Sequence, residues 1–167
     1  MPSAGRDLQM FSIALMLIAA DLPAQPMTVE IARDPITDGV RASATVRSDG
    51  HRLVVSCEPG EYDGARIVFH ARRWLAPGHL LSGDRPLTYR FDSQPPRRMM
   101  WDVEDRRATL AGRRRVAYFL QALQSAGQVV IRARDAEYRR FDAIFPLKDV
   151  QAAIAQVLAA CGDQPAG

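Results

Sequence analysis

Residues on which common active sites depend are scarce in this sequence. The 167 residues include 2 cysteines and 3 histidines, and aromatic residues make up 7% of the chain. The motifs H-E-x-x-H, G-x-S-x-G and G-x-G-x-x-G are absent, as is a Walker loop. These motifs hold zinc, a nucleophilic serine, a dinucleotide or phosphates at defined positions. We therefore expect a protein that is not an enzyme and that uses no cofactor.

The histidines are expected at the surface rather than at a metal. His51 is in a predicted turn, His70 is on the outward side of a predicted strand, and His79 is in a loop. No carboxylate or third ligand has a recognisable spacing to them. The sequence therefore predicts no metal site.

Lysine is almost missing, because Lys148 is the only lysine among the 22 Lys and Arg residues. The formal net charge of +3 and the isoelectric point near 9.2 are lower than expected for a dedicated nucleic-acid-binding protein, so no specific nucleic acid is expected as a partner. The arginine excess reflects either codon usage in a GC-rich genome or a functional need. In both cases the planar guanidinium suits carboxylates and phosphates.

No apolar run is long enough to cross a membrane, which takes about 20 residues. The apolar run at residues 10–20 has the length of the central part of a signal peptide, and Arg6 precedes it. We expect residues 1–24 to be a signal peptide, cleaved after Ala24 or, failing that, after Ala20. A buried N-terminal helix is the alternative. The predicted location is therefore the periplasm or the extracellular space, with no transmembrane span in the mature protein.

The two cysteines, Cys57 and Cys161, are too far apart for a zinc ribbon or a thioredoxin-type motif. Cys57 shares one face of a predicted strand with Leu53 and Val55, and Cys161 ends the apolar stripe of a predicted helix over 149–161. Both sulfurs should therefore point into the core. In an oxidising compartment we expect them to form a disulfide, and two unpaired thiols in a cytosolic protein are the alternative.

Alternating apolar residues predict strands in most of the chain, and a 3.6-residue period predicts two helices. The expected strands are residues 27–33, 40–47, 52–58, 65–71, 86–92, 97–103, 128–134 and 138–145, and the expected helices are 112–126 and 149–161. No strand alternates with a helix in the βαβ manner. We expect a single α+β domain over residues 25–161, a mostly antiparallel sheet or sandwich, with the C-terminal helix tied to the sheet by the disulfide. Residues 162–167 are expected to be a flexible tail.

Several short motifs occur in a recognisable order. They are the export signal, the strand Leu53 to Cys57, the run Tyr89-Arg90-Phe91-Asp92, the tryptophan Trp101, the run Phe141 to Phe145, and Ala159-Ala160-Cys161. This order resembles the VasI type of periplasmic accessory protein associated with type VI secretion, and related uncharacterised exported proteobacterial proteins. The resemblance covers residues 41–161. It implies an exported, non-enzymatic protein and supplies no catalytic residue.

Two carboxylates, Asp92 and Asp102, lie at the ends of two neighbouring predicted strands. If these strands pair, the carboxylates could approach each other like the two acids of a glycosidase. Arg90, Arg97 and Arg98 lie among them in the sequence, however, and predict a surface network of ion pairs that are individually weak.

Arginines are the more informative pattern. Arg113, Arg114 and Arg115 begin a predicted helix, where the dipole disfavours each positive charge by about 0.3–1 kcal/mol. Arg90 and Arg132 are on outward faces of predicted strands. These five arginines are candidate contacts for an anion or a partner, and a solvated basic surface is the alternative.

Together these patterns predict an exported protein that acts through contacts with an envelope protein, and the exposed arginines favour an acidic one. An accessory role in type VI secretion is the specific form of this hypothesis. A periplasmic inhibitor or immunity protein that blocks an enzyme or toxin is the first alternative. A small hydrolase using Asp92 and Asp102 is the second. The oligomeric state is not predicted.

Overall fold

The structure is a computed structural model that describes residues 23–36, 38–57, 64–77, 83–160 and 162. The predictions for the signal peptide, for His79 and for Cys161 concern residues wholly or mostly outside these ranges. The same holds for the flexible tail.

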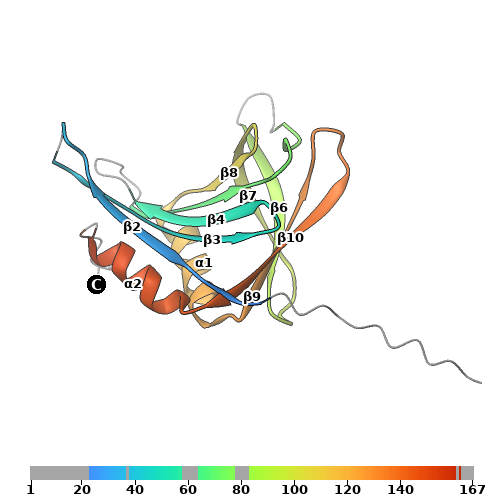
Figure 1. Cartoon of the computed structure of the whole chain (residues 1–167). Helices are drawn as coiled ribbons and strands as arrows, with labels where there is room; N and C mark the ends of the chain where they lie inside the picture. Colours follow the sequence, from blue (N-terminus) through green and yellow to red (C-terminus); the bar gives the residue numbers. More distant parts are fainter. Residues whose placement is uncertain (1–22, 37, 58–63, 78–82, 161, 163–167) are drawn as a thin grey trace, which may run out of the picture.

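Among the described residues, ten strands form one sheet, and two helices pack against its inner face (Figure 1). The strands are β1 (Gln25–Pro26), β2 (Thr28–Arg33), β3 (Val40–Ser48), β4 (His51–Cys57), β5 (Arg66–His70), β6 (Asp84–Phe91), β7 (Arg97–Glu104), β8 (Arg107–Leu110), β9 (Gln128–Arg134) and β10 (Arg140–Lys148), and the helices are α1 (Arg113–Ser125) and α2 (Val150–Ala160). The order across the sheet is β1-β10-β9-β6-β7-β8-β5-β4-β3-β2. All described neighbours are antiparallel except β1 and β10. The predicted α+β class is confirmed, and the sandwich alternative is wrong because these strands belong to one sheet.

The sheet curves until its two edges approach each other (Figure 1). β1 pairs with β10 at one edge and β2 pairs with β3 at the other, although only Met27 separates β1 from β2. Met27 is buried, and β10 also contacts β3. The segment from β1 to β2 therefore bridges the two edges, and the sheet nearly closes around its core.

The turn between β3 and β4 follows directly from its sequence. Asp49 and Gly50 both have positive φ angles, of 47° and 76°, and Ser48 pairs with His51. Positive φ at both central residues is the geometry of a type I′ turn, which matches the twist of the two strands. A hairpin therefore joins the two strands predicted at residues 40–47 and 52–58.

Two short strands were not predicted. β1 has two residues and β8 has four, which is too short for an alternating pattern to be recognised. β10 also continues through Pro146 to Lys148, beyond its predicted end at residue 145, and β1 pairs with this extension.

The centre of the core is an aromatic cluster around Phe119 of α1. The ring centroid of Phe119 lies 5.0 Å from that of Tyr89, 5.1 Å from that of Phe91 and 5.9 Å from that of Trp101. All four side chains are buried. These rings therefore hold α1 against β6 and β7.

Candidate functional site

The three arginines at the start of α1 do not have the same role. The N-cap residue is Gly112, which offers no side-chain acceptor, and the first turn contains no acidic residue. Arg113 and Arg114 are exposed. Arg115 instead donates a hydrogen bond from Nη1 to the carbonyl oxygen of Met100, at 3.3 Å. Arg115 therefore connects α1 to β7 while it remains exposed, and a contact of the three arginines with an anion or a partner stays a prediction.

The reason for this contact is the short length of β8. β8 pairs with β7 only from Asp102 to Glu104, so it leaves the preceding part of that edge without a described strand partner. The Arg115 guanidinium donates to the carbonyl of Met100, which lies on the part of the β7 edge that β8 does not cover. Replacing Arg115 would thus affect the fold as well as any binding.

Arg90 and Arg132 lie on the outer face of β6 and β9, whereas α1 packs on the inner face. Arg132 binds Asp142 through two hydrogen bonds, from Nε to Oδ1 and from Nη2 to Oδ2, both at 2.7 Å. These bonds lower the pKa of the Asp142 carboxyl, and nearby Arg140 and Arg90 lower it further. The five predicted arginines therefore do not form one patch. Arg132 forms an ion pair with Asp142 of the same chain.

A different group of basic residues does lie in one row on the outer face. Arg47 of β3 is opposite Arg52 of β4, Arg52 is opposite His70 of β5, and His70 is opposite Arg107 of β8. Neighbouring strands are about 4.7–4.9 Å apart, so these side chains follow one another at that spacing. We call Arg47, Arg52, His70 and Arg107 the basic row.

The charges of the basic row are poorly compensated. Among the described residues, Arg47, Arg52 and Arg107 form no ion pair within 4.0 Å, although Glu104 is the neighbour of Arg107 at one end of the row. Burial lowers the pKa of the central histidine, His70, and the flanking Arg52 and Arg107 lower it further. Like charges placed directly opposite on a sheet destabilise it. Arg47 and Arg52 are the two charged residues directly opposite each other, so this pair costs stability. Arg107 donates a hydrogen bond from Nε to Oγ1 of Thr109 at 3.2 Å.

The sequence does not predict that these residues form a row, for a physical reason. The alternating pattern places Arg52 and His70 on outward faces, but it does not say which residues of separate strands are opposite each other. Arg107 was missed because β8 was not predicted.

Asp92 and Asp102 are not brought together. Asp92 lies in the turn after β6, where its carboxylate accepts hydrogen bonds from the backbone N–H of Gln128 at 2.8 Å and of Gly127 at 3.4 Å. Asp102 is opposite Asp84 at the far end of the β6–β7 hairpin. The eight residues from Asp84 to Asp92 correspond to roughly 26 Å along the strand, while a glycosidase pair needs about 5–9.5 Å. The approach of these carboxylates that the hydrolase alternative requires does not occur, and Asp92 instead holds the connection between α1 and β9.

His51 was expected to be solvated, and this is wrong, because only 5% of its surface is exposed. Its ring stacks between those of Phe69 and Phe141, with centroid distances of 5.8 and 5.6 Å. Its Nδ1 accepts a hydrogen bond from the backbone N–H of Arg72 at 3.2 Å. Burial lowers the pKa of His51, and this effect outweighs the nearby Asp49 carboxylate, which acts in the opposite direction.

We expect the free energy of unfolding to decrease as the pH falls from about 7 to about 5.5. Because the folded-state pKa of His51 is below 6.5, the unfolded chain binds this proton more strongly. The contribution of the neutral His51 ring to the free energy of unfolding is therefore complete above pH 6.5 and is lost as the pH falls toward the folded-state pKa of His51. The lowered pKa of His70 acts in the same direction. Urea unfolding at several pH values should show a shallower pH dependence for His51→Gln than for the wild type. Identical slopes would contradict the assignment.

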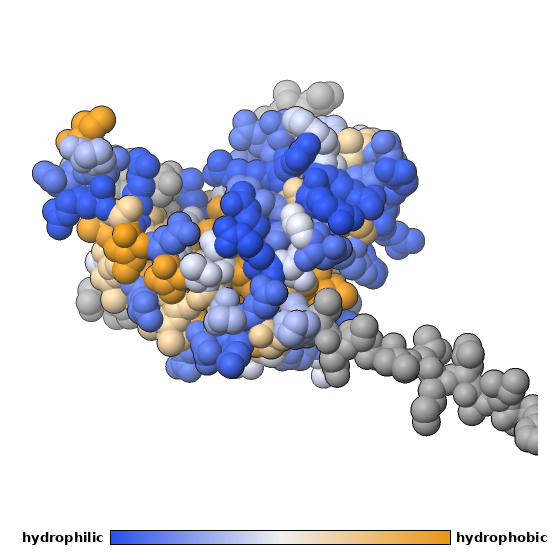
Figure 2. Space-filling model, viewed as in Figure 1, coloured by the Kyte–Doolittle hydropathy of each residue, from blue (hydrophilic) through white to orange (hydrophobic). Residues whose placement is uncertain are grey.

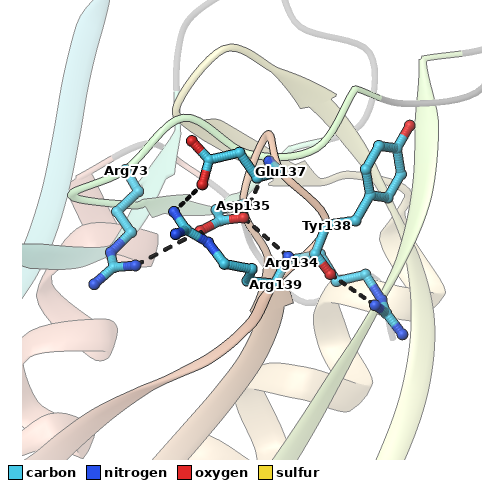
Figure 3. A network of polar contacts seen from close by, with 6 residues as sticks. All are labelled: Arg73, Arg134, Asp135, Glu137, Tyr138 and Arg139. Atoms are coloured by element: carbon cyan, nitrogen blue, oxygen red, sulfur yellow. Dashed lines mark hydrogen bonds and ion pairs between the residues drawn. The ribbon is translucent and has the colours of Figure 1, made fainter.

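A second polar cluster, at the tip of the β9–β10 hairpin, is fully used by the fold (Figure 3). Asp135 is buried, and its carboxylate accepts hydrogen bonds from the backbone N–H groups of Glu137 and Arg139 and from Nε of Arg139, at 3.1, 3.0 and 3.1 Å. Nη1 of Arg73 lies 3.6 Å from the same carboxylate. Burial would raise the pKa of Asp135, but the hydrogen bonds from Arg139 and Glu137 together lower it.

Backbone hydrogen bonds hold this tip against the segment after β5. The N–H of Ala136 donates to the carbonyl of Trp74, and the N–H of Ala76 donates to the carbonyl of Arg134, both at 2.9 Å. The Asp135 carboxylate thus fixes the turn, and the backbone hydrogen bonds dock it against the segment after β5.

The described residues contain no group of three or more His, Cys, Asp or Glu side chains that could hold a metal ion. α1 and α2 have 13 and 11 residues, and neither has the length and apolar character of a membrane-spanning helix.

No family model matches the chain, and neither a curated protein nor a solved structure is significantly similar to it. Similarity to known proteins therefore assigns no function to this chain.

Proposed function

We propose that the protein is exported and acts without catalysis, by binding an acidic partner protein of the cell envelope. The observation that carries this proposal is the basic row, in which Arg47, Arg52 and Arg107 flank His70 without a described ion pair of their own. Carboxylates of a partner would relieve the repulsion between Arg47 and Arg52, which are directly opposite each other. The binding free energy would then include the loss of this like-charge repulsion, which destabilises the unbound protein.

The geometry of the row favours a protein partner. Side chains three or four residues apart on a helix are about 5–6 Å apart, which is close to the spacing between neighbouring strands. An acidic helix face lying across β3, β4, β5 and β8 could therefore place one carboxylate near each guanidinium. A role as an accessory protein in type VI secretion is the specific form that we propose, and it rests on the resemblance to VasI-type proteins.

We also propose the disulfide between Cys57 and Cys161. Cys57 is buried at the end of β4, and its Sγ lies 3.7 Å from the carbonyl oxygen of Val157 in α2. In the sequence, Cys161 follows Val157 by four residues, which is one helical turn on the same face. The sulfur of Cys57 is thus directed at the turn over which the side chain at position 161 is expected. An oxidising compartment outside the cytoplasm is where such a bond persists.

Removal of two charges from the basic row is expected to weaken binding to an acidic peptide. A fluorescent decaglutamate peptide serves as the probe, and fluorescence anisotropy measures its binding at low salt and at about 0.5 M salt. Exposed ion pairs contribute about 0.2–1 kcal/mol each, so Arg52→Gln/Arg107→Gln should weaken binding roughly threefold to tenfold. High salt should remove most of the binding by the wild type.

The matched control is Arg113→Gln/Arg114→Gln, which removes the same net charge from exposed positions at the start of α1. This variant should bind the peptide nearly as well as the wild type. If both double variants lose the same affinity, overall charge rather than the basic row attracts the peptide. The proposed binding face would then be wrong.

A further inference from the structure

The outer edge of β2 is an open sheet edge. Among the described residues, β2 pairs only with β3, because β10 ends at Lys148 and the chain continues into α2. α2 contacts β2, β3 and β4, so it lies across their inner face rather than along the edge. The β2–β3 register has no bulge, and β2 contains neither proline nor lysine, which are two of the usual means of protecting an edge, although Glu30 and Arg33 are charged.

The direction of the backbone groups on this edge follows from the adjoining turn. Asp34 donates its N–H to the carbonyl of Gly39 and accepts a hydrogen bond from the N–H of Asp38, so both of its backbone groups point into the β2–β3 hairpin. Backbone groups of successive residues in a strand point to opposite sides. Val29, Ile31 and Arg33 therefore present their N–H and C=O groups to the open edge.

The surface beside this edge is uncharged and partly apolar. Ile31 is 55% exposed, although it is on the inward side of β2 together with the partly buried Val29. α2 contains no charged residue, whereas 25% of the whole chain is charged. Figure 2 shows hydrophobic residues gathered between β2 and α2. An open edge beside such a surface is typical of an interface.

We propose that a second copy of this chain occupies the edge, by antiparallel pairing of β2 with β2 of the second copy across a two-fold axis at Ile31. Ile31 of each copy then exchanges two hydrogen bonds with its counterpart, and Val29 pairs with Arg33 on both sides of the axis. The two-fold axis keeps the inner faces of both sheets on the same side. The two sheets thereby become continuous, and the Ile31 side chains meet above the α2 helices.

Charge selects this register over the neighbouring one. An axis at Glu30 would place the two Glu30 side chains directly opposite each other, which is unfavourable. With the axis at Ile31, Glu30 is opposite Ala32 of the second copy. Within each chain Ala32 is the neighbour of Arg41 on β3, so Arg41 lies two strands, or about 10 Å, from Glu30 of the other copy. Nη2 of Arg41 lies 3.1 Å from Oδ2 of Asp34 in its own chain, and the Arg41 side chain is 58% exposed. Across the short Ala32 side chain, Glu30 of the other copy would therefore be a second carboxylate near this guanidinium.

The oligomeric state of the protein expressed from its full sequence tests this proposal. Analytical ultracentrifugation over a concentration series should show a dimer for the wild type. Ile31→Lys places two positive charges opposite each other on the axis and should raise the dissociation constant at least about tenfold. The matched control is Ile144→Lys, since Ile144 is also an exposed strand isoleucine but lies on β10, away from the β2 edge.

A crosslink tests the register. Residues that exchange both hydrogen bonds have Cα atoms about 5.5 Å apart, which a disulfide can span. Ile31→Cys should therefore give a covalent dimer under mild oxidation, and Ile144→Cys should not. A wild type that stays monomeric, dimers that persist in Ile31→Lys, or an Ile31→Cys dimer that does not crosslink would each overturn the proposal. Pairing of the edge with a different protein's strand would appear as a monomeric wild type.

Discussion

Phe119→Ala is expected to destabilise the protein by about 3–5 kcal/mol, which is the usual cost of removing a buried phenylalanine ring. The side chain has no exposed surface, and it contacts the rings of Tyr89, Phe91 and Trp101. Its loss would leave a cavity between α1 and the sheet, because strands paired on both sides cannot move in to fill the space. Urea or thermal unfolding followed by circular dichroism measures the loss.

Tyr118→Ala is the matched control for this substitution. Tyr118 is the preceding residue of α1, is 39% exposed, and contacts the Arg97 guanidinium at 4.9 Å from its ring centroid. We expect a loss of about 0.5–1 kcal/mol, the value of an exposed cation–π contact. Equal losses for Tyr118→Ala and Phe119→Ala would show that the aromatic cluster is not the centre of the core.

Reduction of the proposed Cys57–Cys161 disulfide should lower the free energy of unfolding by about 2–5 kcal/mol. The bond would close a loop of roughly 100 residues, and the entropy of the unfolded chain limits its contribution to about 4.7 kcal/mol. Wild-type protein prepared in an oxidising compartment should therefore unfold at lower urea when reductant is present. The double variant Cys57→Ser/Cys161→Ser should unfold at the same urea concentration with and without reductant.

Alkylation and intact mass give an independent measurement. Oxidised wild-type protein should take up no alkylating reagent, and it should take up two equivalents after reduction. Two accessible thiols before reduction would contradict the disulfide. They would also weaken the proposal that the protein is exported, because the two hypotheses depend on the same oxidising environment.

The two proposed contact surfaces are separate, so they can be tested independently. The basic row crosses β3, β4, β5 and β8 on the outer face, and the self-association surface is the edge of β2 with the adjoining side of α2. Ile31→Lys leaves the row unchanged, and Arg52→Gln/Arg107→Gln leaves the edge unchanged. A dimer would present two basic rows to a partner, one from each copy.

Local patterns were enough to predict most of the elements and their buried faces. Leu87, Tyr89 and Phe91 alternate along β6, and Val116, Phe119, Leu120 and Leu123 recur at helical spacing in α1. These periods are properties of a few consecutive residues, so they can be recognised without knowing the neighbours in space. Only β1 and β8 were missed, because they are too short to show a period.

Everything that depends on which strand lies next to which was decided by the tertiary structure. The alternating pattern assigns a side of the sheet to each residue, but the register between strands is set by contacts between residues far apart in the chain. For this reason the basic row was not predicted, and the sequence left open whether Asp92 and Asp102 approach each other. For the same reason the burial of His51 went unrecognised, since Phe69 and Phe141, which enclose its ring, come from β5 and β10.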